Sequence, residues 1–369
     1  MKKLVFVGGG HAHMEILANL DRMVGQGYSA VLIAPGPYHY YSGMGPGMLG
    51  GTYRPDQIRF NTGKIVRKAG AVFVRDYAAR IDPDRKRVYL GSGDWLAYDV
   101  LSCNAGSQVP VDMVSKGDDG VFTVKPIERL RQLQAEIILR ASARRIRIAI
   151  VGGGPSAAEI AGNIWQLVKT RGAKMPEIVI LAGKGLLSHF GRGIRQRVIS
   201  LMRQRKIRIE EGEYARAVSG TGITTGSGRS LACDLAVLAT GVRPVSLFRD
   251  SGLPVGPDGG LPVNRFLQCA AYPDIFGGGD CIYFEPMPLP KLGVYAVRQN
   301  PVLLHNVLAQ LEGRRLKPFV PGKRYLTIFN LGGGIGLFNR GKLTFGGRLA
   351  FRLKDFIDRR FMARYRALE

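Results

Sequence analysis

The chain has 369 residues, of which 46% are hydrophobic and 50 are glycine, and its formal net charge is +25 at pH 7. This length suits two packed domains, and the composition excludes a largely disordered chain. The positive charge comes without a zinc-finger spacing, an RNP-like aromatic pattern or a basic heptad repeat, so we expect no nucleic-acid partner. The four cysteines form no CxxC pair and no zinc spacing, so we expect reduced thiols and no metal site.

The N-terminus begins with lysines and a short apolar run. Only residues 4–7 are apolar before three glycines, which is too short for the apolar region of a secretory signal peptide. No stretch approaches ~20 uninterrupted apolar residues, the length of a transmembrane helix. We therefore expect a cytoplasmic protein, unless it lies on a membrane surface.

Two similar strand–turn–helix units stand far apart in the chain. The first joins an apolar strand to Gly8-Gly9-Gly10-His11-Ala12-His13 and a helix over residues 14–20, with His13 where a small residue usually stands. The second joins a strand over residues 146–151 to Gly152-Gly153-Gly154-Pro155-Ser156-Ala157, which fits the pattern G-x-G-x-x-A. Glycines allow the tight turn and let a pyrophosphate approach the N-terminal N–H groups of the helix. The two units predict two dinucleotide sites.

Neither unit ends its second strand with the acidic residue that usually binds the ribose hydroxyls. The strand over residues 30–33 runs into Ala34-Pro35, and the strand over residues 178–181 runs into Ala182-Gly183-Lys184. Lys184 can tolerate a 2′-phosphate. Both NADH and NADPH therefore stay open as the second dinucleotide.

Three later strands end in turns of small residues. Residues 98–107 end in Asn104-Ala105-Gly106-Ser107, and residues 234–244 end in Ala239-Thr240-Gly241-Val242-Arg243-Pro244. Residues 272–281 form a strand that delivers an aspartate after three glycines. In this order the motifs resemble the two-dinucleotide-binding-domain flavoproteins, which include the pyridine nucleotide-disulfide oxidoreductases. The first A-T-G position of that superfamily is degenerate here.

The resemblance implies an α/β fold with two Rossmann-like domains in a three-layer ββα arrangement and a C-terminal amphipathic helical cap. The FAD-binding domain is expected over residues 1–110 and 245–320, and the NAD(P)-binding domain over residues 111–244. Residues 321–369 are expected to form a hairpin and an amphipathic helix. Residues 72–74, 86–90 and 96–101 are expected to form antiparallel strands that cover the first sheet.

The resemblance also implies the cofactors and the residues that bind them. In the superfamily the first glycine motif binds FAD, the second binds NAD(P)H, and the glycine–aspartate motif places a carboxylate on a ribityl hydroxyl. The residues expected to bind the two cofactors are Gly8, Gly10, His11, Ala12, Ser42, Ala105, Gly106, Gly152, Gly154, Pro155, Ser156, Gly241, Gly279, Asp280 and Ala296. NADH or NADPH is expected as the substrate that reduces FAD.

The electron acceptor is a separate question. The absence of a CxxC disfavours the disulfide-reducing branch of the superfamily. Residues 290–301 resemble instead the A-x-x-Q segment of type II NADH dehydrogenases, in which a helix end lies against the flavin and lines the quinone pocket. This resemblance implies that Gln299 hydrogen-bonds a quinone carbonyl while Ala296 leaves room for the ring. An ordinary helix start stays open as the alternative.

Two charged residues are further catalytic candidates. Glu159, in the helix after the second glycine turn, resembles a glutamate that lies near the nicotinamide in type II dehydrogenases, where it can position the ring or relay a proton. A carboxylate in that turn also stabilises a helix end, which is the alternative. Lys125 is a candidate for neutralising the reduced flavin, and a surface lysine is the alternative there.

Four segments resemble a narrower group of flavoproteins that occur fused to, or beside, selenide, water dikinase. They are residues 8–13, 38–44, 125–127 and 352–362. Proteins of this group are generally described as type II NADH dehydrogenase-like.

We therefore expect an FAD-dependent oxidoreductase that moves a hydride from NAD(P)H to the flavin and then two electrons to a quinone. A sulfide:quinone oxidoreductase is the main alternative, but its chemistry needs two cysteines beside the flavin, because a thiolate accepts the sulfur. Cys103, Cys233, Cys269 and Cys281 do not fall at the usual redox positions of that family. A flavin reductase of selenium metabolism and a non-catalytic flavin-binding sensor or chaperone also stay open.

The C-terminal end predicts a hairpin and one helix. A strand over residues 324–329 and a turn at residues 339–341 precede a helix over residues 348–369. Apolar side chains recur along this helix at steps of three or four, namely Leu349, Leu353, Phe356, Ile357, Phe361, Tyr365 and Leu368. Charged side chains occupy its other face and flank, namely Arg352, Asp355, Arg359, Arg360, Arg364 and Arg366.

A basic amphipathic helix with aromatic side chains is typical of a membrane interface. We therefore expect residues 348–369 to attach the protein to an anionic membrane, at the inner face of the cell membrane. Docking of the helix on the protein's own core or on a dimer partner stays open. The oligomeric state, including a homodimer, stays open as well.

Overall fold

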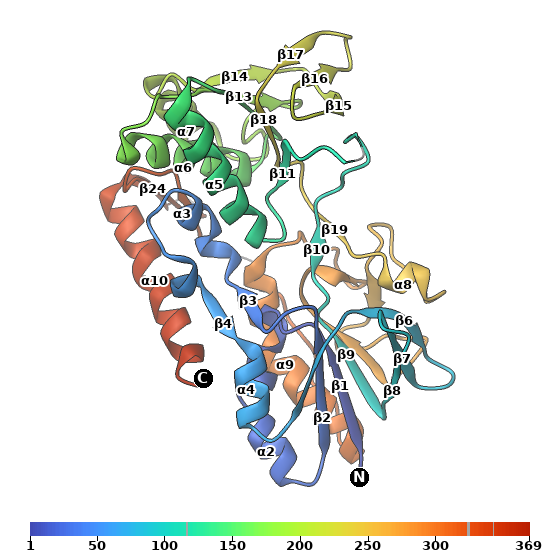
Figure 1. Cartoon of the computed structure of the whole chain (residues 1–369). Coiled ribbons are helices and arrows are strands. Elements are labelled where there is room, and N and C mark those ends of the chain that lie inside the picture. The colour runs from blue at the N-terminus through green and yellow to red at the C-terminus, as the bar shows by residue number, and fades with distance from the viewer. Residues whose placement is uncertain (116, 323–324, 342) are drawn as a thin grey trace.

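The structure, a computed structural model, describes residues 1–115, 117–322, 325–341 and 343–369. It contains two five-stranded parallel sheets, near the bottom and the top of Figure 1. In spatial order the first sheet consists of β21 (Ile275–Gly277), β9 (Val100–Cys103), β1 (Lys3–Val7), β2 (Ser29–Ala34) and β5 (Val72–Arg75). The second consists of β11 (Val121–Thr123), β18 (Leu235–Leu238), β12 (Arg147–Val151), β13 (Glu177–Ala182) and β14 (Arg208–Glu211).

The central strands β1 and β12 are apolar on both faces. Their inner residues, such as Phe6 and Ile150, are completely buried. Parallel strands are buried on both faces when helices cover them, which is why such strands have continuous rather than alternating apolar sequences. The two predicted strand–turn–helix units are thus confirmed, and each supplies the central strand of a parallel sheet.

The helix after the second glycine turn has strong end signals. α6 (Pro155–Arg171) begins with proline in its first turn and ends at Gly172 in a left-handed conformation with φ +64°, the usual arrangement at helix ends. The remaining α-helices are α1 (Met14–Leu17), α2 (Leu20–Gly25), α3 (Gly45–Leu49), α4 (Thr62–Lys68), α5 (Glu128–Ala143), α7 (Arg192–Gln204), α8 (Leu247–Asp250), α9 (Gly293–Glu312) and α10 (Arg348–Arg366). The helix predicted over residues 14–20 is interrupted after Leu17.

The smaller sheets surround these layers. They are β3 (Tyr38–Tyr40) with β4 (Arg59–Asn61), β6 (Ala78–Asp82) with β7 (Arg87–Leu90) and β8 (Trp95–Ala97), β10 (Ser107–Gln108) with β19 (Arg243–Pro244), β15 (Ala215–Val218) with β16 (Gly222–Thr225) and β17 (Ser230–Ala232), and β20 (Leu261–Val263) with β22 (Ile282–Phe284). Short 3-10 helices are η1 (His11–His13), η2 (Ser42–Met44), η3 (Pro55–Ile58) and η4 (Gly279–Cys281).

The expected antiparallel strands are only partly present. Residues 72–74 lie in β5, which pairs in parallel with β2 at the edge of the first sheet, with Val72 opposite Val31. The antiparallel layer is made by β6, β7 and β8. The expectation is thus confirmed for residues 87–90 and 96–97, whereas residues 100–101 lie in β9 of the first sheet. A short apolar strand has the same sequence pattern in either pairing, because the direction depends on the connection and not on the strand itself.

The C-terminal segment forms a hairpin and a helix. β23 (Thr327–Asn330), β24 (Gly336–Arg340) and β25 (Leu343–Gly347) pair antiparallel, and α10 contacts all three as well as β4. Figure 1 shows α10, in red, running from this hairpin along the side of the first sheet's domain. Arg324, at the start of the predicted strand, lies outside the described residues. Among the residues described, no helix is both long enough and apolar enough to cross a bilayer.

Candidate cofactor and active site

A first cavity of about 330 Å³ lies at the carboxyl ends of β1, β2 and β9. Parallel α/β sheets bind ligands at this edge. Nine of the residues expected at the cofactors line it, namely Gly8, Gly10, His11, Ser42, Ala105, Gly106, Gly279, Asp280 and Ala296. Ala12 does not, because its methyl group is buried against Gly278.

Both turns need glycine because the backbone of a neighbouring strand end lies close to them. Gly8 has φ +84°, and a Cβ there would lie 2.3 Å from the carbonyl oxygen of Asn104. Gly152 has φ +140°, and a Cβ there would lie 2.2 Å from the carbonyl oxygen of Ala239. The same contact between the turn and the neighbouring strand end is therefore built in both units.

His13 explains why the first turn departs from the usual pattern. Its imidazole is completely buried, with Nδ1 2.6 Å from the carbonyl oxygen of Gly8 and Nε2 2.9 Å from the hydroxyl of Ser102. Burial lowers its pKa to about 4, so the ring is neutral. His13 joins the turn to β9 and contributes no surface to the cavity.

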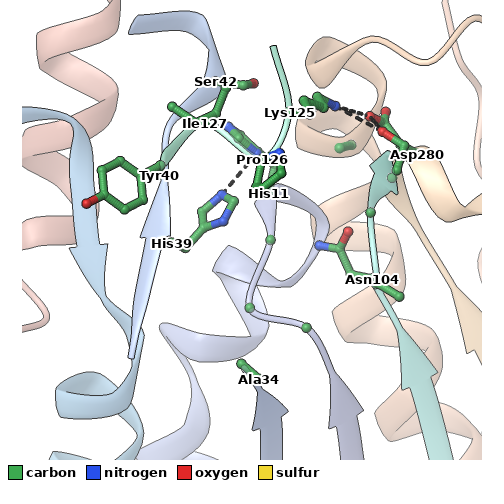
Figure 2. Close-up of a pocket in the computed structure, with 18 of the residues that line it drawn as sticks. His11, Ala34, His39, Tyr40, Ser42, Asn104, Lys125, Pro126, Ile127 and Asp280 are labelled. Carbon is green, nitrogen blue, oxygen red and sulfur yellow. Dashed lines mark hydrogen bonds and ion pairs between the residues drawn. The ribbon is translucent and has the colours of Figure 1, made fainter. Parts of the chain in front are cut away.

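Three polar side chains meet at one end of the first cavity. The Nζ of Lys125 lies 2.6 Å from Oδ2 of Asp280, and the hydroxyl of Ser107 donates to the same oxygen at 2.7 Å. Figure 2 shows Lys125 and Asp280 pointing toward one another. Lys125 is therefore an ion-paired residue of the cavity and not a surface lysine.

Two histidines meet on another wall. The Nε2 of His39, on β3, lies 3.2 Å from Nδ1 of His11 (Figure 2). The Nε2 of His11 is buried and has no hydrogen-bond partner among the described residues, and the same holds for Nδ2 of Asn104. Burial lowers the pKa of His11 to about 4 and that of His39 well below its usual value, so both rings are neutral. Sequence reasoning did not name His39 and Asn104 as site residues, although both lie within segments that it had identified, residues 38–44 and the turn that begins at Asn104.

A second cavity of about 680 Å³ lies at the carboxyl ends of β12, β13 and β18. It is lined by the expected residues of the second unit, namely Gly152, Gly154, Pro155, Ser156, Glu159 and Gly241. Lys184 lines it as well. Ser42, Lys125, Ile127 and Gly293 line both cavities. The two glycine turns, far apart in the sequence, thus face spaces that adjoin at these four residues.

Glu159 has partners that only the tertiary structure supplies. It lines the second cavity, and its Oε1 accepts a hydrogen bond from the backbone N–H of Asn330 at 2.7 Å. Desolvation raises its pKa to about 7, although the ammonium of Lys354 on α10 acts in the opposite direction. Near neutral pH this carboxyl group is half protonated, a property of groups that exchange protons.

Gln299 has a different environment from the one expected. Its side chain is 1% exposed and lines neither large cavity, and its Oε1 accepts the backbone N–H of Gly279 at 2.7 Å. The amide oxygen therefore supports the turn that carries Asp280. Ala296, one turn earlier on α9, faces the first cavity.

The α10 helix docks with a polar pair turned inward. The Nζ of Lys354 donates to Oδ2 of Asp358 at 2.6 Å and to the carbonyl oxygen of Gly43 at 2.7 Å, and the hydroxyl of Tyr41 donates to Asp358 at 3.1 Å. Both charged side chains are at most 10% exposed. Of the predicted apolar stripe, Leu349, Leu353, Phe356 and Ile357 are exposed, whereas Phe361, Tyr365 and Leu368 pack on the core. The predicted stripe is thus divided between two faces.

All four cysteines are buried. Burial raises the pKa of Cys233 and Cys281 to about 11, and it raises those of Cys103 and Cys269 as well. The thiolate is the reactive form of cysteine. These side chains are therefore poor nucleophiles.

Known proteins resemble this chain along nearly its whole length. The type II NADH:quinone oxidoreductase of Staphylococcus saprophyticus is 24% identical over 385 residues, which cover 97% of this chain and 94% of that protein. The solved structure of NDH2 from Plasmodium falciparum with NADH has a TM-score of 0.82 at 15% identity and covers 98% of this chain and 96% of its own.

The solved sulfide:quinone oxidoreductase of Aquifex aeolicus has a TM-score of 0.81 at 19% identity, over 100% of this chain and 92% of its own. At these identities the two structures show the fold. The model of the family "Pyridine nucleotide-disulphide oxidoreductase" matches residues 2–300, and the chain belongs to that family.

Proposed function

We propose that the protein is an FAD-dependent oxidoreductase that takes a hydride from NAD(P)H and passes two electrons to a quinone. The observation that carries this proposal is the junction of the two cavities at Ser42, Lys125, Ile127 and Gly293. A dinucleotide on each glycine turn can bring its reactive ring to this junction. Hydride transfer requires such contact between two cofactor rings.

The first cavity fits FAD. Its glycine turn leaves no room for a Cβ, as a pyrophosphate cradle requires, and Nδ2 of Asn104 beside Gly10 is a buried donor without an acceptor. Asp280, which lines this cavity, would accept hydrogen bonds from ribityl hydroxyls. FAD, when bound, supplies the chemistry that accepts a hydride and releases two electrons.

The chain's own residues position the reactants and control charge. Ile127 and Gly293 shape the junction, and Lys125 brings a basic side chain to it. Glu159 holds or releases a proton at its carboxyl oxygens close to neutral pH. NADH and NADPH both suit the second cavity, because no acidic residue ends β13 and Lys184 lines the wall.

A quinone is the acceptor that the comparisons favour, since one relative that matches almost this whole chain is named for NADH:quinone oxidoreduction. The sulfide-oxidising alternative shares the fold. It needs accessible thiolates beside the flavin, and the buried cysteines with raised pKa values do not supply them. The link to selenide, water dikinase rests on sequence resemblance at residues 38–44 and 352–362, and selenium species belong among the acceptors to be assayed.

The organisation of the chain supports three functional parts. Residues 1–110 and 245–320, which contain the first sheet, form the FAD-binding domain, and residues 111–244, which contain the second sheet, form the NAD(P)-binding domain. Residues 321–369 form the amphipathic cap.

The exposed face of α10 suits a membrane surface. Leu349 is 70% exposed and Phe356 is 61% exposed, and Leu343 at the hairpin is 60% exposed. Arginines on the same helix add positive charge. We propose that this face binds an anionic membrane, where quinones dissolve, and that the protein is peripheral at the inner face of the cell membrane.

The test is a pair of half-reactions on the purified protein. The flavin's visible absorbance should bleach when NADH or NADPH is added without oxygen, and mixing with a short-chain quinone should restore it. Reoxidation by sulfide with quinone and by selenite is measured in parallel. A protein that binds no flavin, or a bound flavin that neither nucleotide reduces, would falsify the proposal.

A further inference from the structure

An aromatic cluster lies where α10 packs beside the first cavity. It consists of His11, Tyr41, Phe60, Phe361 and Tyr365. Phe361 of α10 is the central ring: its centroid lies 4.8 Å from that of Tyr41, 5.1 Å from that of Tyr365 and 5.9 Å from that of His11. The rings of Phe361 and His11 are stacked at an interplanar angle of 20°.

The cluster has the cavity on one side and the outer surface of α10 on the other. His11 lines the first cavity on one side. Phe361 is partly exposed, and it lies one helical turn beyond Ile357, which belongs to the exposed apolar face of α10. The stack of Phe361 on His11 therefore separates the proposed flavin site from the face that we assign to the membrane.

The cluster contains one polar atom without a partner. Nδ1 of His11 faces His39, but Nε2 of His11 is enclosed and makes no hydrogen bond with the residues described. A buried polar atom without a partner is unfavourable, and proteins rarely keep one unless a ligand or a rearrangement satisfies it. Both histidines are neutral, so His39 can donate to Nδ1 of His11 while His11 carries its hydrogen on Nε2.

We propose that the ring of Phe361 occupies the binding position of a quinone head group, and that a quinone displaces it and accepts a hydrogen bond from Nε2 of His11. This inference rests on the proposed function and names where its acceptor binds. A quinone ring is planar and close in size to a phenyl ring, so it can stack on Tyr41 as Phe361 does, with one edge turned toward His11. Its carbonyl oxygen supplies the acceptor that Nε2 lacks, and its tail leads toward the apolar face of α10.

Displacement by the ligand makes a specific prediction for Phe361→Ala. The variant no longer has a ring to displace, so oxidised holoenzyme should bind decylubiquinone more tightly. One aromatic stacking contact corresponds to a change in Kd of about fivefold. Equilibrium dialysis without NADH measures this Kd independently of turnover. Phe361→Leu also removes the aromatic stacking, so it should change Kd in the same direction. Because leucine keeps aliphatic atoms at the position, this variant guards against a folding defect.

His11 is tested by removing its nitrogens. In the Phe361→Ala background, His11→Phe keeps an aromatic ring and should weaken decylubiquinone binding about fivefold, the effect of one hydrogen bond. Phe345→Ala is the matched control, because it also removes a ring stacked on a neighbour, at 4.6 Å from Phe338. Its Kd for decylubiquinone should equal that of the wild type.

The outcomes separate this inference from the proposed function. If the wild-type flavin is bleached by NADH and restored by quinone, yet Phe361→Ala, Phe361→Leu and the wild type bind decylubiquinone equally, the quinone does not use this position. Equal binding with and without the nitrogens of His11 would remove His11 from the site. If the wild-type flavin is not restored by any quinone, the proposed function fails first.

Discussion

The raised pKa of Glu159 predicts that its replacement by glutamine stabilises the protein at alkaline pH. The glutamine keeps an oxygen for the backbone N–H of Asn330 but carries no charge. In the wild type the ionised carboxylate is held in surroundings that disfavour charge, which is the cause of the raised pKa. The variant removes that charge and keeps the shape.

The sign and size of the stability difference between the wild type and Glu159→Gln follow from the linkage between protonation and folding. The pKa rises from 4.5 in the unfolded chain to about 7 in the folded one, so the folded state binds the proton more tightly. Below pH 4.5 both states are protonated and carry no penalty. As pH rises to 7 the wild type loses stability relative to the variant, by about 1–3 kcal/mol after screening by water in the cavity. Above pH 7 the difference stays constant.

The assay is thermal unfolding of both proteins between pH 4 and pH 8. The difference in Tm should grow from zero at the acid end to about 1–4 °C at the alkaline end. Glu213→Gln is the matched control with the opposite sign, because hydrogen bonds, first from Ser227, lower the pKa of Glu213. That variant should lose stability relative to the wild type as pH rises. A flat difference curve for Glu159→Gln would show that the carboxyl group is not held in a desolvated position.

Three further outcomes are expected. Asp280→Ala should weaken FAD binding at least about tenfold, the effect of a charge-assisted hydrogen bond, whereas Asp274→Ala, outside the first cavity, should keep the wild-type flavin content. Gly152→Ala should raise the KM for NAD(P)H at unchanged flavin content, since its Cβ would meet the carbonyl oxygen of Ala239 at 2.2 Å; an unchanged KM would show that the turn relaxes freely. Phe356→Ser should reduce flotation with anionic liposomes, and equal flotation would mean that another surface binds the lipid.

The parts of the fold that follow from local sequence were predicted well. Each glycine turn lies directly after a buried strand and before a helix, so a few consecutive residues specify the whole unit. The same holds for Asp280, which follows its strand and its glycines within one segment. The place of each cavity also follows from these motifs, because the parallel strands of one sheet present their carboxyl ends at one edge.

The partners of the candidate residues could not be predicted in this way. Glu159 accepts a hydrogen bond from Asn330 of the hairpin, and the charge of Lys354 on α10 lowers its pKa. Both residues are distant from Glu159 in the sequence. His39 lies on β3 and contacts His11, which follows β1. No sequence pattern near either residue indicates that the two would meet. Gln299 was assigned to the quinone from its segment alone, whereas its amide oxygen is bound to Gly279. Side-chain geometry of this kind depends on how separate elements pack.

The orientation of α10 shows why hydropathy alone does not predict which side of an amphipathic helix faces the protein. Neither Lys354 nor Asp358 was assigned to a face of the helix from the sequence, yet both are buried on the side that carries Phe361 and Tyr365. An ion pair in such a position gains little net stability, because desolvation offsets its attraction. The ion pair instead determines the orientation of α10. Rotating the helix to bury Leu353 and Phe356 would leave the carbonyl oxygen of Gly43 and the hydroxyl of Tyr41 without their present partners. The polar pair therefore selects the inward face, and the apolar residues that it excludes become the exposed face of the helix.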